Sequence, residues 1–201
     1  MKNLIKLSVL LISSIISINV LAEEPAAKLD RQQCALCHGP GGNTTSEQFP
    51  MLAGEPAAYF INQMKAFRDK TRADQNAQRF MWGIASRLTD EQIEQLASYY
   101  EAQTPTHKGK ISDQKKYDQG MMLFTQGNQD KNIPACAVCH GDKAQGNATM
   151  PRLAGQHEEY LRKQLKVFYG NERPAAVAMH EIVKGLSDSD IDALAQYLQA
   201  Q

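Results

Sequence analysis

The chain has 201 residues, with 22 basic and 22 acidic side chains, 42% hydrophobic residues and a mean hydropathy of −0.47. This composition excludes an integral membrane bundle and an intrinsically disordered chain. The balanced charge also argues against a general nucleic-acid-binding protein, which carries a basic surplus. The length suits one large domain or two small ones.

The first 22 residues predict a secretory signal peptide. Lys2 and Lys6 are the only charges before an apolar run of about 15 residues that ends at Leu21, and Ala22 is a small residue suited to the cleavage position. The run is shorter than the ~20 apolar residues that span a bilayer, and an uncleaved anchor is the alternative. We therefore expect export to the periplasm, where thiols pair unless another reaction consumes them.

The rest of the chain contains one pattern twice. A Cys-x-x-Cys-His-Gly motif begins at Cys34 and again at Cys136, and a Pro-x-Leu-Ala-Gly segment begins at Pro50 and again at Pro151. A Tyr-x-x-x-Gln-x-x-x-Phe pattern follows each segment, at an offset of 101 residues. Such repetition predicts two small domains in tandem. The expected organisation is a signal peptide at 1–22, a first domain at 23–102, a linker at 103–114 and a second domain at 115–201.

A helix is expected ahead of each cysteine motif, although the two differ in length. The second unit has an amphipathic stretch over 115–124, whereas the first unit has only a short counterpart over 26–33. The linker contains Pro105, which would end a preceding helix, and almost no apolar residues. No segment shows the alternation of a strand, so the predicted fold class is all-α.

Two further helices are expected after each motif. Apolar residues at helical spacing predict one helix over 56–67 and its counterpart over 157–169, where Gly170 is suited to end it. A terminal helix is expected to begin at Thr89, with a glutamine three residues later, and again at Ser187, with an aspartate three residues later. Both pairs are spaced as capping boxes.

The cysteine motifs predict two covalently bound haems. In a Cys-x-x-Cys-His motif the two thiols bond the haem vinyl groups and the histidine ligates the iron from the proximal side. All four cysteines of the chain belong to such motifs. The predicted residues are Cys34, Cys37 and His38 in the first unit and Cys136, Cys139 and His140 in the second.

Two other readings of the cysteines fit less well. A thioredoxin-like redox pair needs a βαβ context, which the sequence does not predict. A zinc site made from two Cys-x-x-Cys pairs usually separates them by ~15–20 residues, whereas 98 residues lie between Cys37 and Cys136. Each unit also has few large apolar side chains, and a buried haem would supply the missing core.

The sixth ligand of each iron is predicted to be a methionine. Met81 and Met179 are the methionines that correspond between the two units, and they follow His38 and His140 by 43 and 39 residues. A methionine at helical spacing is more often a core residue, but two equivalent ones favour ligation. The predicted metal ligands are therefore His38, Met81, His140 and Met179, and thioether ligation raises the reduction potential of the iron.

The three remaining histidines compete poorly with these methionines. His107 lies in the predicted linker, and His157 and His180 align with Pro56 and Trp82 of the first unit. We expect all three to be exposed or bonded locally, with His180 as the alternative ligand of the second iron.

Two further pairs of residues have predicted supporting roles. The carbonyl oxygens of Pro50 and Pro151 are expected to accept a hydrogen bond from Nδ1–H of the proximal histidines, which would orient the rings and tune their basicity. A simple turn is the alternative. Arg72 and Arg173, which match at the offset of 101, are candidates to pair with haem propionates, although surface arginines explain them equally well.

Together these features resemble the class I cytochromes c and, among them, the dihaem cytochrome c4 family. The resemblance rests on the haem motifs, the Pro-x-Leu-Ala-Gly segments, the Tyr-x-x-x-Gln-x-x-x-Phe helices and the late methionines. It implies two class I domains related by pseudo-twofold symmetry, with haems facing each other across the interface. One departure is the short N-terminal helix of the first unit, which lacks counterparts of Gly120 and Phe124 and leaves the packing behind the first haem open.

The resemblance also implies a periplasmic carrier, sometimes loosely associated with the membrane, that takes single electrons from a quinol-oxidising complex and gives them to a haem-copper terminal oxidase. Two filled axial positions favour such a carrier over an enzyme, and we expect a monomer with no catalytic residues and no nucleic-acid partner. The alternatives are a dihaem oxidoreductase with one open iron, such as a thiosulfate dehydrogenase or a peroxidase, and a cytochrome subunit of a larger dehydrogenase.

Overall fold

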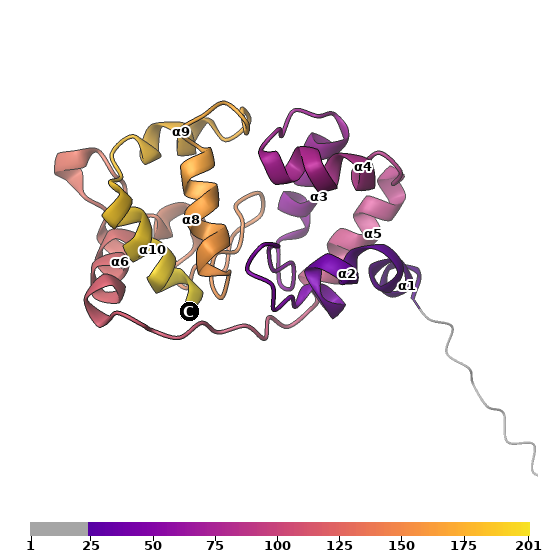
Figure 1. The fold of residues 1–201 in the computed structure, drawn as a ribbon, viewed down its shortest axis with the longest axis horizontal. Helices are drawn as coiled ribbons and strands as arrows, with labels where there is room; N and C mark the ends of the chain where they lie inside the picture. Colours follow the sequence, from indigo (N-terminus) through magenta and orange to yellow (C-terminus); the bar gives the residue numbers. More distant parts are fainter. Residues whose placement is uncertain (1–23) are drawn as a thin grey trace, which may run out of the picture.

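The computed structural model describes residues 24–201, and the predicted signal peptide, 1–22, lies outside the described residues. In the described part the regular elements are helices, and strand-like pairing is limited to two isolated bridges. The prediction of an all-α chain is therefore confirmed. Figure 1 shows two helical domains side by side, joined by one extended segment. No helix within residues 24–201 has the length and apolar character needed to cross a bilayer.

The first domain is built around its terminal helix, α5. Helices α1 and α3 pack against α5, and one buried cluster contains Phe60 and Met64 of α3 together with Ile93, Leu96 and Tyr100 of α5. In chain order the elements are α1 (Pro25–Leu29), η1 (Asp30–Cys34), α2 (Ala35–His38), η2 (Pro40–Gly42), α3 (Ala57–Arg68), η3 (Ala77–Met81), α4 (Trp82–Ala85) and α5 (Asp90–Glu101).

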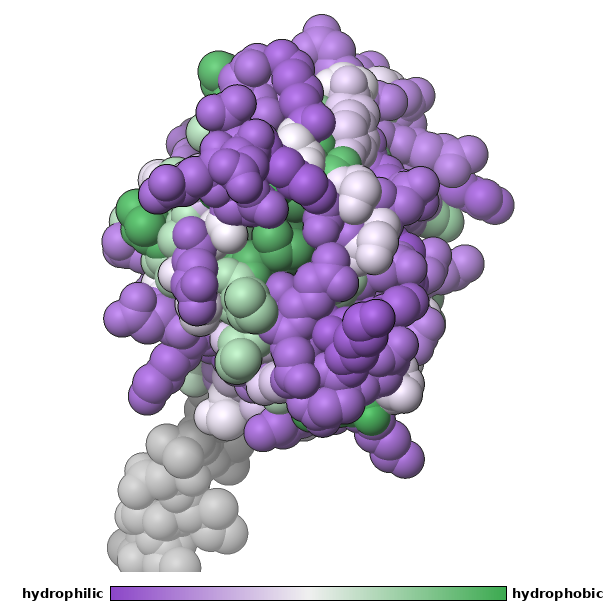
Figure 2. Space-filling model, turned by 90° about the vertical axis from the view of Figure 1, so that its left-hand side faces the viewer, coloured by the Kyte–Doolittle hydropathy of each residue, from purple (hydrophilic) through white to green (hydrophobic). Residues whose placement is uncertain are grey.

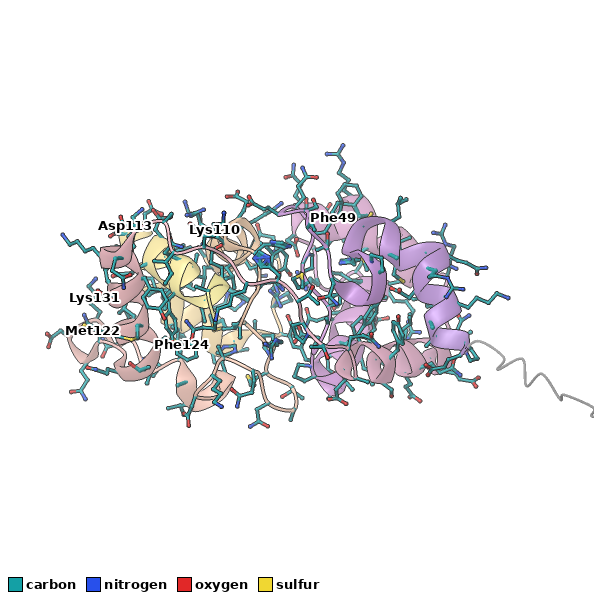
Figure 3. All side chains as sticks on the ribbon, turned by 90° about the horizontal axis from the view of Figure 1, so that it is seen from below. Phe49, Lys110, Asp113, Met122, Phe124 and Lys131 are labelled. Carbon is teal, nitrogen blue, oxygen red and sulfur yellow. The ribbon has the colours of Figure 1, made fainter. Side chains whose placement is uncertain are left out.

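The second domain repeats this arrangement with a longer first helix. Helices α6 and α8 pack against α10, and Leu123, Phe124 and Ile191 belong to one buried cluster. Figure 2 looks onto this end of the molecule and shows a mainly hydrophilic surface around an apolar area, while Figure 3 places Met122 at the outer edge and Phe124 further inside. The elements are α6 (Gln114–Gln126), η4 (Gln129–Lys131), α7 (Ala137–His140), α8 (Glu158–Val167), α9 (Val177–Val183) and α10 (Asp188–Gln199).

The two domains fasten their N-terminal helices by different chemistry. In the second domain Phe124 is fully buried, and its ring centroid lies 5.4 Å from that of Tyr197. In the first domain α1 has five residues and continues into η1, whose Asp30 is buried. The Asp30 carboxylate accepts hydrogen bonds from the Tyr100 hydroxyl at 2.7 Å and from the Gly41 N–H at 3.1 Å. The short helix expected from the sequence therefore packs through a buried carboxylate.

Both predicted capping boxes are present. Thr89 and Gln92 cap the start of α5 reciprocally, and Ser187 and Asp190 do the same for α10. In each pair the side chain of one residue accepts from the backbone N–H of the other, which satisfies two of the donors that a helix start leaves free. The terminal helices therefore begin where the sequence predicts.

The predicted end of the second long helix at Gly170 is wrong. Helix α8 ends at Val167, and the next residue, Phe168, keeps right-handed helical backbone angles as its C-cap. The carbonyl oxygen of Phe168 is bonded by His180 Nδ1 at 2.7 Å. A contact from α9 thus occupies the end of the helix, and Gly170 lies in the turns that follow.

The segment between the domains is attached to both of them. Between α5 and α6, residues 102–113 contain no helix. The N–H of Thr106 donates to the side-chain oxygen of Asn43 at 2.8 Å in the first domain. The N–H of Gly109 donates to the carbonyl oxygen of Gln199 at 2.7 Å in the second domain. The connecting segment is therefore hydrogen-bonded to both domains.

Candidate functional site

In each domain the Cys-x-x-Cys-His motif forms a short helix that ends at a buried histidine. Helix α2 ends at His38 and helix α7 ends at His140. Gly39 and Gly141 follow with positive φ values of 71° and 81°, a backbone conformation that ends a helix and that glycine adopts without strain. The two motifs therefore have the same local geometry in separate domains.

A prolyl carbonyl sets the orientation of each imidazole. Nδ1 of His38 lies 2.9 Å from the carbonyl oxygen of Pro50, and Nδ1 of His140 lies 3.1 Å from that of Pro151. Because a carbonyl oxygen can only accept, Nδ1 carries the proton and Nε2 keeps its lone pair. Burial lowers the pKa of both imidazoles, against the opposing effect of these hydrogen bonds. Each histidine therefore presents one unprotonated nitrogen, the form that binds a metal.

The four thiols are free. Cys34, Cys37 and Cys136 are half-buried, and Cys139 is exposed. Burial raises the pKa of Cys34 and raises that of Cys136 to about 11, so both remain protonated at neutral pH. Within residues 24–201, no three His, Cys, Asp or Glu side chains converge into a metal-binding group of their own. Each motif instead offers two thiols and one neutral imidazole, a donor set that fits a covalently attached haem.

The methionines of the described chain separate by their exposure. Met81 and Met179 are half-buried, and each packs at the edge of the buried cluster of its own domain. Met81 ends η3, and Met179 lies in α9. The other five are either buried in the protein or exposed to solvent: Met51, Met64, Met121, Met122 and Met150.

Two segments of the first domain depart from α-helical geometry next to predicted haem-site residues. Both η1 and η3 are π-helical turns, and they end at Cys34 and Met81 respectively. Such turns are rare in proteins and often occur at functional sites. The local backbone of the first domain is therefore irregular at the thiol and the thioether that the sequence singles out.

Both ring nitrogens of His180 face backbone carbonyl oxygens of its own domain. Its Nδ1 lies 2.7 Å from the carbonyl oxygen of Phe168, and its Nε2 lies 3.0 Å from that of Arg173. Trp82, the counterpart of His180 in the first domain, donates its indole N–H to the carbonyl oxygen of Arg72 at 2.8 Å. His180 therefore contacts the carbonyl oxygen of Arg173 as Trp82 contacts that of Arg72, and both of its ring nitrogens lie within hydrogen-bond distance of a backbone carbonyl oxygen.

The expectation that His157 is exposed or locally bonded is wrong. It is 2% exposed, and its Nε2 donates to the carbonyl oxygen of Thr44 in the other domain at 3.0 Å. Its ring centroid lies 4.3 Å from that of His107 in the connecting segment. The position after Gln156 faces the first domain, and only the docking of the two domains makes this burial evident.

Arg72 and Arg173 lie in the domain interface, so the surface alternative for them is wrong. They are 7% and 8% exposed. Arg72 donates to the side-chain oxygen of Gln164 at 3.1 Å, and Arg173 donates to that of Gln63 at 3.2 Å, each across the interface. The buried guanidinium groups are stable because oxygen acceptors surround them. Residues that match at the offset of 101 thus make the same contacts in both directions, as pseudo-twofold symmetry requires.

Two interface residues escaped the sequence analysis. Glu55 and Gln156 are 6% and 5% exposed. Glu55 accepts from the backbone N–H of Arg152 at 2.8 Å, and Gln156 accepts from that of Met51 at 2.9 Å. Both follow the Pro-x-Leu-Ala-Gly segment directly. Their equivalent positions in the repeat were the sequence feature that could have indicated a shared role for these two residues.

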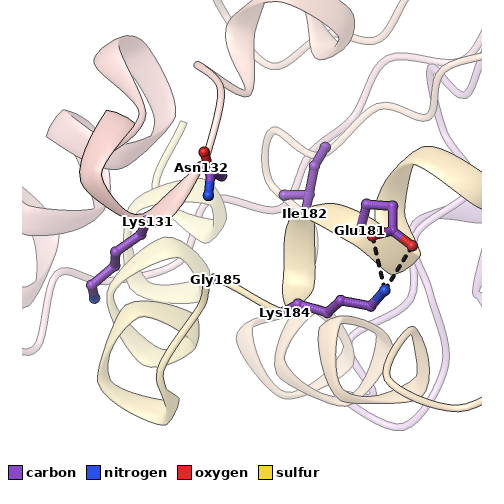
Figure 4. Close-up of a pocket in the computed structure, with 6 residues that line it drawn as sticks. All are labelled: Lys131, Asn132, Glu181, Ile182, Lys184 and Gly185. Atoms are coloured by element: carbon purple, nitrogen blue, oxygen red, sulfur yellow. Dashed lines mark hydrogen bonds and ion pairs between the residues drawn. The ribbon is translucent and has the colours of Figure 1, made fainter.

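A pocket in the second domain is separate in its lining from the predicted haem-site residues. Figure 4 shows Lys184 of this pocket paired with the Glu181 carboxylate at 2.7 Å. The lining residues are Lys131, Asn132, Glu181, Ile182, Lys184 and Gly185. The wall of the pocket contains this ion pair and the backbone of Gly185.

Comparison with known proteins identifies the class of the chain. The profile of the cytochrome c family, described as "Cytochrome c", matches residues 24–103 and 117–201, one match in each domain. The fold and the two motifs therefore define a c-type cytochrome with two tandem cytochrome c domains.

Three relatives narrow the family. Cytochrome c4 of Azotobacter vinelandii is 34% identical over 176 residues, which cover 83% of this chain and 83% of that protein. The solved structure of Acidithiobacillus ferrooxidans cytochrome c4 has a TM-score of 0.77 and 36% identity, and the match covers 84% of this chain and 98% of that one. A protein of Thiomonas intermedia named "Thiosulfate dehydrogenase electron acceptor" is 34% identical over 182 residues, which cover 88% of this chain and 82% of that protein. The chain belongs to the cytochrome c4 family, whose two domains imply two covalently bound c-type haems.

Proposed function

We propose that the protein is a periplasmic carrier that moves single electrons from a quinol-oxidising complex to a haem-copper terminal oxidase. The observation that carries this proposal is the equivalence of the two domains, each of which holds two free thiols, a neutral buried imidazole and a half-buried methionine. A bound haem supplies an iron that changes its oxidation state by one electron. Two filled axial positions leave no vacancy for substrate chemistry.

In this proposal His38 and Met81 hold one iron, and His140 and Met179 hold the other. The prolyl bonds to Nδ1 support the histidines as ligands, because they leave Nε2 free in both domains. The engagement of both nitrogens of His180 supports Met179 as the second ligand. Thioether ligation favours reduced iron, which suits a carrier of high potential.

Carbon monoxide tests this ligation in the reduced holoprotein. We expect its absorption spectrum to stay unchanged on addition of the gas, because both irons keep six ligands. The variants M81A and M179A are each expected to bind carbon monoxide at one haem, with about half of the full signal. A rapid change in the wild type would show an open iron and would favour an enzyme over a carrier.

The exposed middle residues of the two motifs support contact with redox partners at those faces. Leu36 is 93% exposed and Val138 is 80% exposed, so each motif presents an apolar side chain at the surface. We expect L36E and V138E to slow electron exchange with the oxidase while the absorption spectrum stays unchanged. Unaltered rates in both variants would place the contact elsewhere.

The proposed location depends on cleavage of the leader after Ala22. We expect the protein recovered from a periplasmic extract to begin at Glu23, as determined by N-terminal sequencing. A chain that keeps Met1 and sediments with membranes would show an uncleaved anchor instead.

The Thiomonas intermedia relative supports a second electron source. Its name describes an electron acceptor of thiosulfate dehydrogenase, which is again a carrier. Stopped-flow reduction of the oxidised protein by the quinol-oxidising complex, or by thiosulfate dehydrogenase with thiosulfate, identifies the donor by the faster rate. Reduction by thiosulfate alone would show that the chain is itself the enzyme.

A further inference from the structure

One peptide unit connects the histidine of the second motif to an acidic side chain of the first domain. The carbonyl oxygen of Pro151 accepts from His140 Nδ1 at 3.1 Å. The N–H of the same peptide group belongs to Arg152 and donates to Glu55 Oε1 at 2.8 Å. The chain of hydrogen bonds therefore runs from an imidazole, through one peptide group, to a carboxyl group of the other domain.

The first domain has the corresponding arrangement with an amide in place of the acid. The carbonyl oxygen of Pro50 accepts from His38 Nδ1 at 2.9 Å, and the N–H of Met51 donates to Gln156 Oε1 at 2.9 Å. Gln156 Nε2 also donates to the carbonyl oxygen of Met51 at 3.1 Å. The amide thus pairs with both backbone groups of one residue and carries no charge.

Glu55 and Gln156 occupy the same place in the repeat, one residue after the Pro-x-Leu-Ala-Gly segment. A protonated carboxyl group can act once as acceptor and once as donor, as an amide does, whereas a carboxylate can only accept. The neutral form of Glu55 is therefore the chemical counterpart of the Gln156 amide, and both forms of Glu55 can accept the bond from the Arg152 N–H.

The surroundings of Glu55 bring its titration close to neutral pH. The side chain is 6% exposed. Burial raises its pKa to about 8, against the opposing effects of the Arg152 N–H bond and of the charges of Arg152, Arg173 and Arg72. These arginines are the charged groups that act on Glu55, and Arg72 is itself paired with Asp74 at 2.9 Å. The carboxyl group therefore changes charge in the range in which cells work.

We infer that Glu55 is a proton-binding residue that couples the reduction potential of the second haem site to pH, through the Arg152–Pro151 peptide group and His140. This inference rests on the proposed ligation of iron by His140. Ionised Glu55 polarises the peptide group, which strengthens the hydrogen bond that the His140 Nδ1–H donates to the Pro151 carbonyl oxygen. A more basic imidazole favours the oxidised metal, and the buried negative charge acts in the same direction. Loss of the proton therefore lowers the potential of this site.

The coupling has a defined balance of charge. Reduction of the second site takes one electron from the donor, and the Glu55 carboxylate takes one proton from solvent. By reciprocity, reduction raises the proton affinity of Glu55 by the same factor as protonation favours reduction. Gln156 does not titrate, so the first site lacks this coupling although its proposed ligands are the same.

Potentiometric titration of the holoprotein at several pH values tests the inference. As the pH rises from about 6 to about 10, we expect the equilibrium constant for reduction of the second site to fall about tenfold. This corresponds to a fall of about 59 mV in the reduction potential of a one-electron couple. The first site should change much less. The variants M81H and M179H assign the signals, because loss of the thioether lowers the potential of the altered domain.

Exchange of the two side chains gives matched variants. E55Q should remove the pH dependence of the second site and hold its potential at the value that the wild type has at low pH. The position of Gln156 shows that an amide fits this place without disturbing the fold. Q156E should confer the pH dependence on the first site. A second site that is independent of pH in the wild type, or an E55Q protein that keeps the dependence, would overturn the inference.

An infrared difference spectrum provides a readout that does not depend on the potentials. We expect reduction near pH 8 to produce the C=O band of a protonated carboxyl group in the wild type, and we expect E55Q to lack this band. Failure of the ligation and failure of the coupling are distinguishable. Binding of carbon monoxide at the second haem would overturn the ligation, whereas flat potentials with unchanged spectra would overturn only the role of Glu55.

Discussion

The phenolic hydroxyl of Tyr100 donates a hydrogen bond to the carboxylate of Asp30 at 2.7 Å, and both side chains are buried in the first domain. The bond joins η1 to α5 just before the first cysteine motif. Burial raises the pKa of Tyr100, so its hydroxyl keeps its proton and remains a donor at neutral pH. In the second domain, the aromatic contact of Phe124 with Tyr197 joins the N-terminal helix to the terminal helix, as this polar contact does in the first domain.

Removal of this donor should weaken the first domain. Y100F leaves the buried carboxylate with one partner fewer, and we expect the free energy of unfolding of the holoprotein to fall by about 1–3 kcal/mol. Urea unfolding measures the change. The matched variant Y99F removes a hydroxyl that lies 3.5 Å from Asp30, and it should cost less than about 0.5 kcal/mol. Equal losses in the two variants would contradict a specific role for the Tyr100 bond.

A glycine at the contact of α6 with α10 should be sensitive to one added methyl group. A Cβ atom at Gly120 would overlap the carbonyl oxygen of Ala193 and would lie 2.8 Å from Tyr197 Cβ. We expect G120A to destabilise the second domain by about 1–3 kcal/mol, because the backbone must shift. G83A is the control, since nothing lies within 4 Å of a Cβ atom there. It should be neutral or slightly stabilising, and a loss equal to that of G120A would point to a general effect of alanine.

The ion pair of Asp190 should make stability depend on acid pH. Burial alone would raise the pKa of Asp190, but hydrogen bonds from Lys131 and Ser187 lower it to about 2. A lowered pKa means that the contribution to stability is present above the unfolded-state value and is lost as the pH falls through about 2. The wild type should therefore lose up to about 2 kcal/mol more than D190N between about pH 5 and about pH 2. Unfolding at each pH measures the difference, and D188N, at an exposed carboxylate, should behave as the wild type.

The buried pair of Arg72 and Asp74 should show strong coupling. The two side chains are 8% and 2% exposed and lie 2.9 Å apart. R72M leaves a buried carboxylate without its cation and should cost about 3–5 kcal/mol. The double variant R72M/D74N should recover part of this loss, because the uncompensated charge is gone. Additive losses in the double-mutant cycle would show that the two side chains act independently.

Attachment of haem should be a condition of folding. Each domain has a small apolar core, and covalent haem adds buried area and three attachment points. We expect a chain in which all four motif cysteines are replaced by alanine to lose most of its helical circular dichroism. The replaced residues are Cys34, Cys37, Cys136 and Cys139. Helical signal equal to that of the holoprotein would show that the domains fold without the cofactor.

Features that depend on local spacing were predictable from the sequence. The capping boxes at Thr89 and Ser187 follow from neighbouring residues, and the repeat itself indicated two tandem domains. Features that depend on docking were not predictable. The burial of Arg72 and the contact of His157 with the other domain arise only when the two units meet, because the sequence of one unit does not specify the surface it faces.

The hydrogen bonds of Asp30 were predictable only in part. The sequence showed that the first N-terminal helix is short and lacks an equivalent of Phe124. It did not show that buried Asp30 takes over this packing role, because a single acidic residue in a short amphipathic stretch is more often exposed to solvent. The burial of Asp30 depends on Tyr100, which lies 70 residues further along the chain.

The exchange of side chains between the domains also makes each domain depend on the other. Glu55 and Gln156 each complete a loop that belongs to the other copy of the repeat. Deletion of either copy would leave the backbone N–H of Met51 or of Arg152 without its acceptor, so each domain supplies a hydrogen-bond partner that the other lacks. A substitution at position 55 consequently takes effect at the backbone of the second repeat, although the residue belongs to the first.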